Sequence, residues 1–336
     1  MKWVPICIIL FNGIMFFLLP AFQRRNLFFA VPVEEDFANT PRAKSLLRLY
    51  QLVNIAATLL AIGAVLFLTH FEDHLVGVIV AQQAVALGLF AWIRNRIAST
   101  TTPPPAAIHS TSLAAESPEV PGMWAFLLLP FLILAGAGMY LSAHWADIPQ
   151  RFPIHFDLNG NPNGWSTKGV KGVFGILLFG ALLQCVFLFL IYGIKTGTRR
   201  AVPGSPRMRF MKANIWMLMI IQWFLGILFG YISLLPIWGA KPAGWLIGGF
   251  TVALVGTVMA FTFYMVKLQG QPTDSENTPD SSWILGGMFY YNPEDPALLV
   301  EKRFGLGYTF NMANRISWGF FVMVALVVLL PTVLFR

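Results

Sequence analysis

Eight long apolar runs dominate the pattern of hydrophobic and polar positions along this chain of 336 residues. They cover residues 3–21, 49–69, 75–92, 123–142, 173–194, 215–235, 244–266 and 318–334. Each run approaches the ~20 residues that a helix needs to cross a hydrocarbon core of about 30 Å. The runs lack a sustained two-residue alternation, which favours helices over barrel strands. The pattern predicts an all-α polytopic membrane protein with about eight transmembrane helices.

The composition agrees with this pattern. Hydrophobic residues make up 57% of the chain and charged residues 11%, against about 25% charged residues in soluble domains. All 15 Asp and Glu residues lie outside the eight runs. An ordinary soluble protein is therefore excluded. The first run has no A-x-A cleavage site before Gln23, so we expect a retained helix and not a cleaved signal peptide.

The basic residues are distributed unevenly between the loops. If the N-terminus is outside, 17 of the 23 Lys and Arg residues fall in inner loops and six lie elsewhere. The positive-inside rule then places both termini outside. It places the loops 22–48, 93–122, 195–214 and 267–317 inside and the loop 143–172 outside. This distribution accounts for the net charge of +8 without a nucleic-acid partner. We expect membrane lipids as partners of the basic loops.

Polar segments divide the chain into five parts. We expect a three-helix membrane part at 1–97, a disordered linker at 98–121, a membrane domain at 122–282, an interfacial module at 283–313 and a last transmembrane helix at 314–336. The linker has five prolines and many Ser, Thr and Ala residues, a composition that cannot form a core. At the start of the second helix, Asn39 or Thr40 can serve as the N-cap, with Pro41 at the first helical position.

The segment 144–171 is the most polar and turn-rich stretch of the outer side, and we expect a small extracellular hairpin there. Asn-Gly pairs at 159–160 and 163–164 favour tight turns, and residues 153–157 alternate like a short strand. We propose His155, Asp157, Trp165 and Lys168 as ligand-binding residues, and Pro153, Gly160, Pro162 and Gly164 as the residues that shape the loop. A carboxylate two residues from a histidine shares its strand face and raises the histidine pKa. The alternative is that His155 and Lys168 only anchor the loop.

The segment 283–313 is too charged to span a membrane, and its pattern predicts a β-hairpin on the cytoplasmic surface. An aromatic run starts at Gly287, the turn falls at 292–296, and a glycine-spaced strand follows. We expect Phe289, Tyr290, Tyr291 and Phe304 at headgroup depth. Lys302 and Arg303 are expected to pair with Glu294, Asp295, Glu301 or lipid phosphates.

The eight apolar runs contain few ionisable or polar side chains. No ionisable residue lies deep in any of them, which argues against a proton-driven transporter. Their polar residues are Asn12, Asn54, Gln82, Gln83, Gln184 and Gln222, which are expected mainly to bond between helices. Small-residue pairs such as Gly226 and Gly230 favour helix packing. One polar cluster is present, and it fits no metal-site spacing: His144, Asp147, His155 and Asp157. The sequence has neither a catalytic nor a nucleotide-binding motif. We therefore expect a non-enzymatic protein without cofactor or metal.

Residues 148–168 resemble the loop motif of a membrane domain of unknown function that occurs in the SdpI-type bacteriocin immunity proteins. The matching positions are Pro153, His155, Phe156, Gly160, Pro162, Gly164, Trp165 and Lys168, while Asp157 replaces a more usual Asn or Gly. Residues 289–314 resemble a short module that accompanies this domain, with matches that include Tyr291, Asn292, Asp295, Lys302, Arg303 and Gly305. The segment 25–48 resembles a further segment of such proteins, in which Phe29 and Ala30 replace the usual Gly and Arg.

The resemblance implies a multi-pass protein of the bacterial cytoplasmic membrane, whose best-known relatives protect the producing cell from a secreted toxic peptide and signal its presence. It implies no catalytic residues. We expect immunity or sensing, with a peptide or protein ligand at the outer loop and a regulator at the cytoplasmic loops. The alternative is a transporter or flippase for a lipid-like or neutral amphiphile, in which Gln82, Gln83, Gln184 and Gln222 form polar stepping points.

Overall fold

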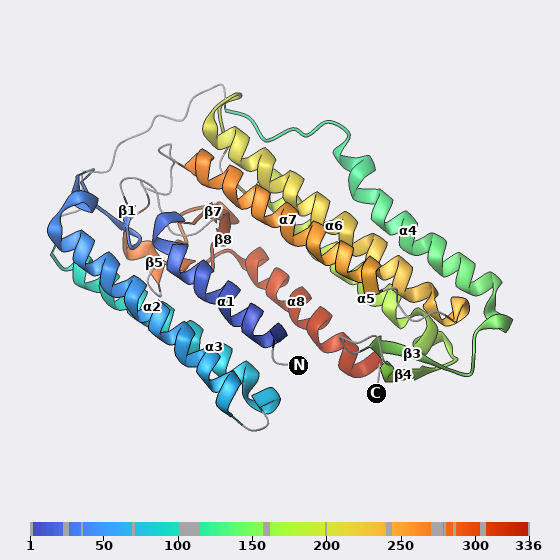
Figure 1. Cartoon of the computed structure of the whole chain (residues 1–336). Coiled ribbons are helices and arrows are strands. Elements are labelled where there is room, and N and C mark those ends of the chain that lie inside the picture. Colours follow the sequence, from blue (N-terminus) through green and yellow to red (C-terminus); the bar gives the residue numbers. More distant parts are fainter. Residues whose placement is uncertain are drawn as a thin grey trace. The chain divides into compact units, whose positions relative to one another are not determined.

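The computed structural model describes residues 3–22, 27–34, 36–68, 71–100, 115–156, 162–198, 200–239, 244–269, 278, 280–284, 287–302 and 307–334. Eight helices account for most of these described residues (Figure 1). They are α1 (Trp3–Leu18), α2 (Pro41–Phe67), α3 (Phe71–Ala98), α4 (Met123–Ala143), α5 (Val170–Gly197), α6 (Pro206–Trp238), α7 (Gly244–Gln269) and α8 (Arg315–Leu334). Each helix overlaps one of the eight apolar runs.

Short strands lie between the helices. They are β1 (Leu27–Phe28), β2 (Val31–Pro32), β3 (Arg151–Phe156), β4 (Pro162–Thr167), β5 (Trp283–Ile284), β6 (Phe289–Tyr290), β7 (Leu299–Glu301) and β8 (Tyr308–Phe310). They form four two-stranded sheets, each from strands consecutive in the sequence. Because a two-stranded sheet has no core of its own, each depends on packing against other parts of the chain.

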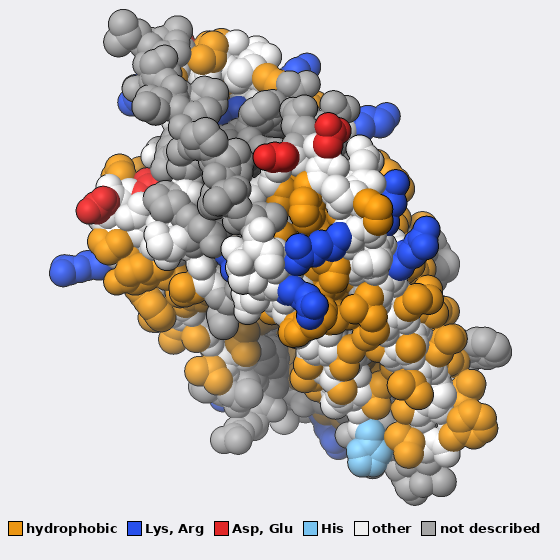
Figure 2. Space-filling model, turned by 90° about the vertical axis from the view of Figure 1, so that its left-hand side faces the viewer, with side chains coloured by type: hydrophobic (Ala, Val, Ile, Leu, Met, Phe, Trp, Pro, Cys, Tyr) orange, Lys and Arg blue, Asp and Glu red, His pale blue; other side chains and the backbone are white. Residues whose placement is uncertain are grey.

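Five of the helices in the described part of the chain are long and apolar enough to cross a membrane: α2, α3 from His74 onwards, α4, α5 and α6. Shorter apolar stretches lie at Pro5–Ala21, which runs from α1 into the 3-10 turn after it, at Val252–Met265 in α7 and at Arg315–Leu330 in α8. Figure 2 shows many hydrophobic side chains on the face that it presents, and Leu60, Phe67 and Val76 are each about three-quarters exposed or more. The chain is thus a mostly helical protein with apolar helices suited to a membrane.

The chain divides into two compact units. Unit 1 comprises Met1–Thr111, Val266–Asp295 and Val300–Met312, and unit 2 comprises Ser112–Met265, Pro296–Leu299 and Ala313–Arg336. The chain passes from the first unit to the second within the predicted linker 98–121, of which residues 101–114 lie outside the described residues. The last part of this linker pairs with another segment of unit 2, because Glu116 and Ala201 form an antiparallel bridge.

Unit 1 is built on the packing of α1 against α2 and of α2 against α3. The helix α2 begins at Pro41 because the Thr40 hydroxyl accepts a hydrogen bond from the Ala43 amide at 3.2 Å. Phe29 and Ala30 form the turn between β1 and β2, with φ of 47° and 63°. Residues other than glycine rarely adopt this left-handed backbone conformation. Burial of the Phe29 ring offsets the cost of this backbone conformation, since its centroid lies 5.3 Å from that of Tyr50 and 5.0 Å from that of Phe90.

Amide side chains join the three helices of unit 1. Gln82 on α3 donates to the Thr58 hydroxyl at 3.0 Å and to the Ile9 carbonyl at 3.3 Å, while its own oxygen accepts from Asn12 at 3.2 Å. Gln83 donates to Asn12 at 3.5 Å. Hydrogen bonds of this kind link helices where no water is available.

Unit 2 contains the packed helices α4, α5 and α6, and an internal proline determines part of their contact. Pro130 has no N–H and removes the helical bond to the Phe126 carbonyl. The Trp223 indole of α6 donates to that carbonyl at 2.9 Å, and Gln222 donates to the next carbonyl, that of Leu127, at 3.4 Å. The Phe126 carbonyl, which has lost its helical partner to the proline, thus becomes a contact site for the neighbouring helix.

Small residues allow this close approach. A Cβ added at Gly226 would lie 2.8 Å from the Pro130 Cβ, and one at Gly230 would lie 3.0 Å from the Ile133 side chain. The predicted packing role of this glycine pair is therefore confirmed. Gln184 of α5 donates to the Gln222 carbonyl at 3.2 Å. Gln184 and Gln222 of unit 2 donate to backbone carbonyls of a neighbouring helix. Gln82 and Gln83 of unit 1 bond to residues of α1 and α2. These contacts agree with the prediction that the polar residues of the runs bond mainly between helices.

The predicted single β-hairpin at 283–313 is wrong. The structure has two separate sheets there, β5 with β6 and β7 with β8. Gly287 and Gly307 lie between the paired strands with φ of 86° and 90°, a conformation that favours glycine. The segment 292–296 does form a turn, in which the Asn292 carboxamide accepts from the Glu294 amide at 3.0 Å. That turn connects two sheets instead of closing one.

Candidate functional site

The candidate site is the β3–β4 hairpin at the end of α4, in unit 2 (Figure 1). The helix ends at Ala143, and His144 follows as its C-cap. The His144 Nδ1 lies 3.0 Å from the Tyr140 carbonyl, and the two rings stack with centroids 4.1 Å apart. A short 3-10 turn, Trp145–Asp147, then redirects the chain into β3.

The strands β3 and β4 pair antiparallel in a defined register. Arg151 lies opposite Thr167, Phe152 opposite Ser166, and Pro153 opposite Trp165. The register shifts on either side of His155. A proline cannot donate to the ladder, so Pro153 and Pro162 restrict how far regular pairing can extend.

One side of the hairpin is anchored in the helix bundle. Phe152 is 2% exposed and packs in an apolar cluster with Ile148 and Leu141. The cluster also contains residues of α4 and α5, namely Leu134, Ala137, Val173 and Leu177. Burying a Phe side chain contributes about 1.5–3 kcal/mol relative to leaving it exposed. The hairpin is therefore held in place before any ligand binds.

Lys168 fastens the base of the hairpin. Its ammonium donates to the Ala146 carbonyl at 3.3 Å and lies 5.7 Å from the centroid of the Trp145 ring. Its backbone amide donates to the Gln150 carbonyl at 2.9 Å. These contacts match the alternative interpretation of Lys168 as an anchor.

The opposite side of the hairpin presents an aromatic and a basic side chain. The Trp165 side chain is 47% exposed, and the Arg151 guanidinium lies 5.0 Å from the centroid of its ring. Trp165 is two residues from Thr167, the partner of Arg151, so the pair lies diagonally on one face. A cation–π contact of this kind contributes about 0.5–1 kcal/mol at an exposed site and restricts both side chains.

A glycine permits the hairpin to lie against the start of α5. A Cβ added at Gly172 would lie 2.6 Å from the Ser166 Oγ and closer still to the Thr167 carbonyl oxygen. The Thr167 oxygen belongs to the backbone of β4 and cannot be displaced without moving the strand. Gly172 therefore sets the distance between the hairpin and the helix.

The residues proposed from the sequence have different positions. Trp165 is exposed, Lys168 is an anchor, and Pro153 lies opposite Trp165. Pro162 and Gly164 lie in β4, opposite Phe156 and His155. The His155 backbone belongs to β3, but its side chain, Asp157 and Gly160 lie outside the described residues. The sequence analysis missed Arg151, although a hairpin centred near residue 159 places it near Trp165.

The module at 283–313 contains a buried polar network in unit 1. Tyr290 is fully buried, which corrects its predicted place at headgroup depth, and its hydroxyl donates to Asp295 at 3.0 Å. Asn311 donates to the carbonyls of Asn292 and Asp295, each at 2.9 Å, and accepts from the Asn292 amide at 3.0 Å. Tyr291 is 51% exposed. The residues Asn292 and Asp295 therefore hold the fold of the module.

The basic residues of this module are described in part. The Lys302 amide donates to the Gly307 carbonyl at 3.1 Å. Burial lowers the pKa of the Lys302 side chain from its ordinary value. Arg303, Phe304 and Gly305 lie outside the described residues.

Two segments of the chain are similar to known families. Residues 131–181 match a domain of unknown function, DUF1648, and residues 293–318 match a family of unknown function, DUF5808. The first match includes the second half of α4, the whole hairpin and the first turns of α5. The second runs from the turn at 292–296 through β7, β8 and Asn311 to the start of α8. Comparison with curated proteins and with solved structures gives no match.

Proposed function

We propose that this chain is a non-enzymatic protein of the bacterial cytoplasmic membrane that recognises a peptide or protein ligand through the β3–β4 hairpin. The function would be immunity to a toxic peptide, or sensing of such a peptide or of envelope stress. The observation that carries the proposal is the two-sided hairpin, which is anchored through Phe152 and Lys168 and presents Trp165 with Arg151 to its surroundings.

The residue types on the exposed side support recognition. Trp and Arg are enriched among the residues that contribute most to binding at protein interfaces. Trp165 and Arg151 already restrict each other, so binding costs less side-chain entropy. We assign ligand contact to Trp165 and Arg151, keep His155 and Asp157 as proposed contacts, and reassign Lys168 to anchoring.

The topology is part of the same proposal. All eight helices would cross the membrane, with α1, α7 and α8 as the shorter apolar spans. Both termini and the hairpin would lie outside, because the four loops proposed to be cytoplasmic hold 17 of the 23 basic residues. A regulator would meet the cytoplasmic loops. The SdpI-type resemblance of residues 148–168 is the support for immunity or sensing over other binding functions.

Gene deletion with complementation tests this function. The deletion strain is challenged with a fixed panel of purified bacteriocins, cationic antimicrobial peptides and envelope stresses, and is complemented with the wild-type chain or with Trp165→Ala/Arg151→Gln. Lys171→Gln is the control, since Lys171 is an exposed charge near the hairpin. We expect deletion to sensitise cells to at least one peptide, with rescue by the wild type and the control but not by the double variant. Equal survival of the deletion strain under every challenge would contradict the proposal.

A further inference from the structure

A second candidate site lies in unit 2 at the other end of α4 from the hairpin. It is a cavity of about 530 Å³ lined by Glu119, the run from Val120 to Ala125, Lys195 and Lys212. The 21 residues of α4 rise about 31 Å, the thickness of a hydrocarbon core. In the proposed topology the hairpin and this cavity therefore lie at opposite membrane surfaces.

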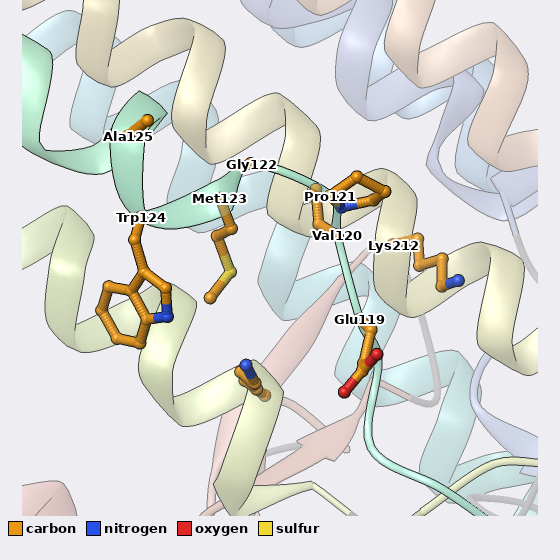
Figure 3. Close-up of a pocket in the computed structure, with 9 residues that line it drawn as sticks. Glu119, Val120, Pro121, Gly122, Met123, Trp124, Ala125 and Lys212 are labelled. Carbon is orange, nitrogen blue, oxygen red and sulfur yellow. The ribbon is translucent and has the colours of Figure 1, made fainter.

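Three segments bring charge to this cavity. Figure 3 shows Glu119 on the segment before α4 and Lys212 on α6. Lys195 stands in the last turn of α5. Its ammonium lies 5.8 Å from the centroid of the Trp124 ring. Lys212 forms neither a hydrogen bond nor an ion pair with any part of the chain that the structure describes. The lining carries two ammonium groups and one carboxylate, which favours an anionic ligand.

The start of α4 adds to this preference. Gly122 precedes the helix in a left-handed conformation, with φ of 69°, and no side chain caps the first turn. Trp124 and Ala125 line the cavity in that first turn, where backbone N–H groups have no partner within the helix. The partial positive charge of a helix start stabilises a nearby phosphate.

The surroundings indicate which phosphate. The Trp124 side chain is 60% exposed at the end of an apolar helix, the position of tryptophans at headgroup level. The exposed Arg200 and Arg209 lie near Lys212 in the sequence, on the side predicted to face anionic lipids. We propose that this cavity binds the phosphate of an anionic phospholipid headgroup, with Lys195 and Lys212 as its ligands and Trp124 beside the glycerol backbone.

A binding assay with the full chain in mild detergent tests this. The probes are short-chain phosphatidylglycerol, short-chain phosphatidylcholine and inorganic phosphate, with bound lipid measured by native mass spectrometry. Lys195→Gln/Lys212→Gln should weaken phosphatidylglycerol binding at least tenfold, whereas the control Arg200→Gln/Arg209→Gln, which removes two charges outside the lining, should weaken it less than threefold. Glu119→Gln should strengthen it severalfold by removing the opposing carboxylate. If the double variant fails to fold, Lys212→Gln alone should still lose at least threefold.

The outcomes separate the sources of phosphate. Phosphatidylglycerol binding that exceeds phosphatidylcholine binding and resists millimolar inorganic phosphate supports the lipid assignment. Equal competition by inorganic phosphate would overturn it in favour of a free phosphate compound. Equal losses in the lining and control variants, or no response to Glu119→Gln, would show that general surface charge and not this cavity binds the lipid, and would overturn the proposal.

Discussion

Substituting Gly172 with alanine tests how the hairpin is held. In most helical positions the change from Gly to Ala stabilises the fold by about 0.5–1 kcal/mol, because glycine loses more conformational entropy on folding. At Gly172 the new Cβ would lie 2.6 Å from the Ser166 Oγ and closer still to the backbone oxygen of Thr167. We therefore expect the opposite sign at this position.

The magnitude follows from two opposing contributions. Overpacking of a tight contact costs about 1–3 kcal/mol, and here the contact is with strand backbone, which cannot rotate away. After subtraction of the helix-propensity gain, Gly172→Ala should lower the free energy of unfolding by about 1–2 kcal/mol. Gly136→Ala on α4 is the matched control, since nothing lies within 4 Å of its added Cβ. That variant should be neutral or slightly stabilising.

Heating of the purified chain in mild detergent, followed by size-exclusion chromatography of the remaining folded protein, measures the difference. A change of 1 kcal/mol shifts the melting temperature by about 2–4 °C in a unit of 150–250 residues, so Gly172→Ala should melt about 2–8 °C below Gly136→Ala. Equal or higher melting of Gly172→Ala relative to Gly136→Ala would refute the reasoning that the hairpin rests directly on α5.

Three further predictions concern topology and the C-terminal module. With Cys7 and Cys185 replaced, Ser166→Cys should react with a membrane-impermeant maleimide in intact spheroplasts and Arg209→Cys only after lysis; the reverse pattern would overturn the proposed topology. Asn311→Ala leaves two carbonyls and one amide of the module without their partner, and should cost about 3 kcal/mol or more in the thermal assay; an unchanged melting temperature would contradict this. The lowered pKa of Lys302 means that the unfolded chain binds more protons just below pH 10.5, so stability should rise as the pH increases toward that value. Lys302→Met should abolish this rise, and a rise of wild-type size in the variant would assign it to another group.

The helices could be predicted from the sequence because each requires a long apolar run. The first residue of each helix was harder to predict. The helix α2 begins at Pro41, eight residues before its apolar run, because the Thr40 cap and Pro41 stabilise a polar first turn. The glycine at 226 could be assigned to packing from its small size, but its partner Pro130 lies 96 residues away and is brought close only by the fold.

The C-terminal module could not be predicted with the same success. The aromatic run from Gly287, the turn at 292–296 and the glycine-spaced segment after it predicted one hairpin. The pairing is instead decided by Gly287 and Gly307, which take positive φ, and by Asn311, which bonds to Asn292 across 19 residues of sequence. Such long-range side-chain bonds leave no periodic signal. In the β3–β4 hairpin, likewise, Phe152 is buried against α4 and α5 while Trp165 stays exposed, and Lys168 is held by Trp145 and Ala146. These contacts form only in the fold.

Site-specific photocrosslinking from the hairpin tests the recognition proposal most directly. A photoreactive phenylalanine analogue replaces Trp165 in living cells, and the adducts are compared with those from Met139, a 69% exposed position on α4 of the same unit. The proposal predicts one recurrent peptide or protein adduct at position 165, lost on addition of Arg151→Gln and absent at position 139. Lipid adducts alone at position 165, or the same adducts at both positions, would contradict it.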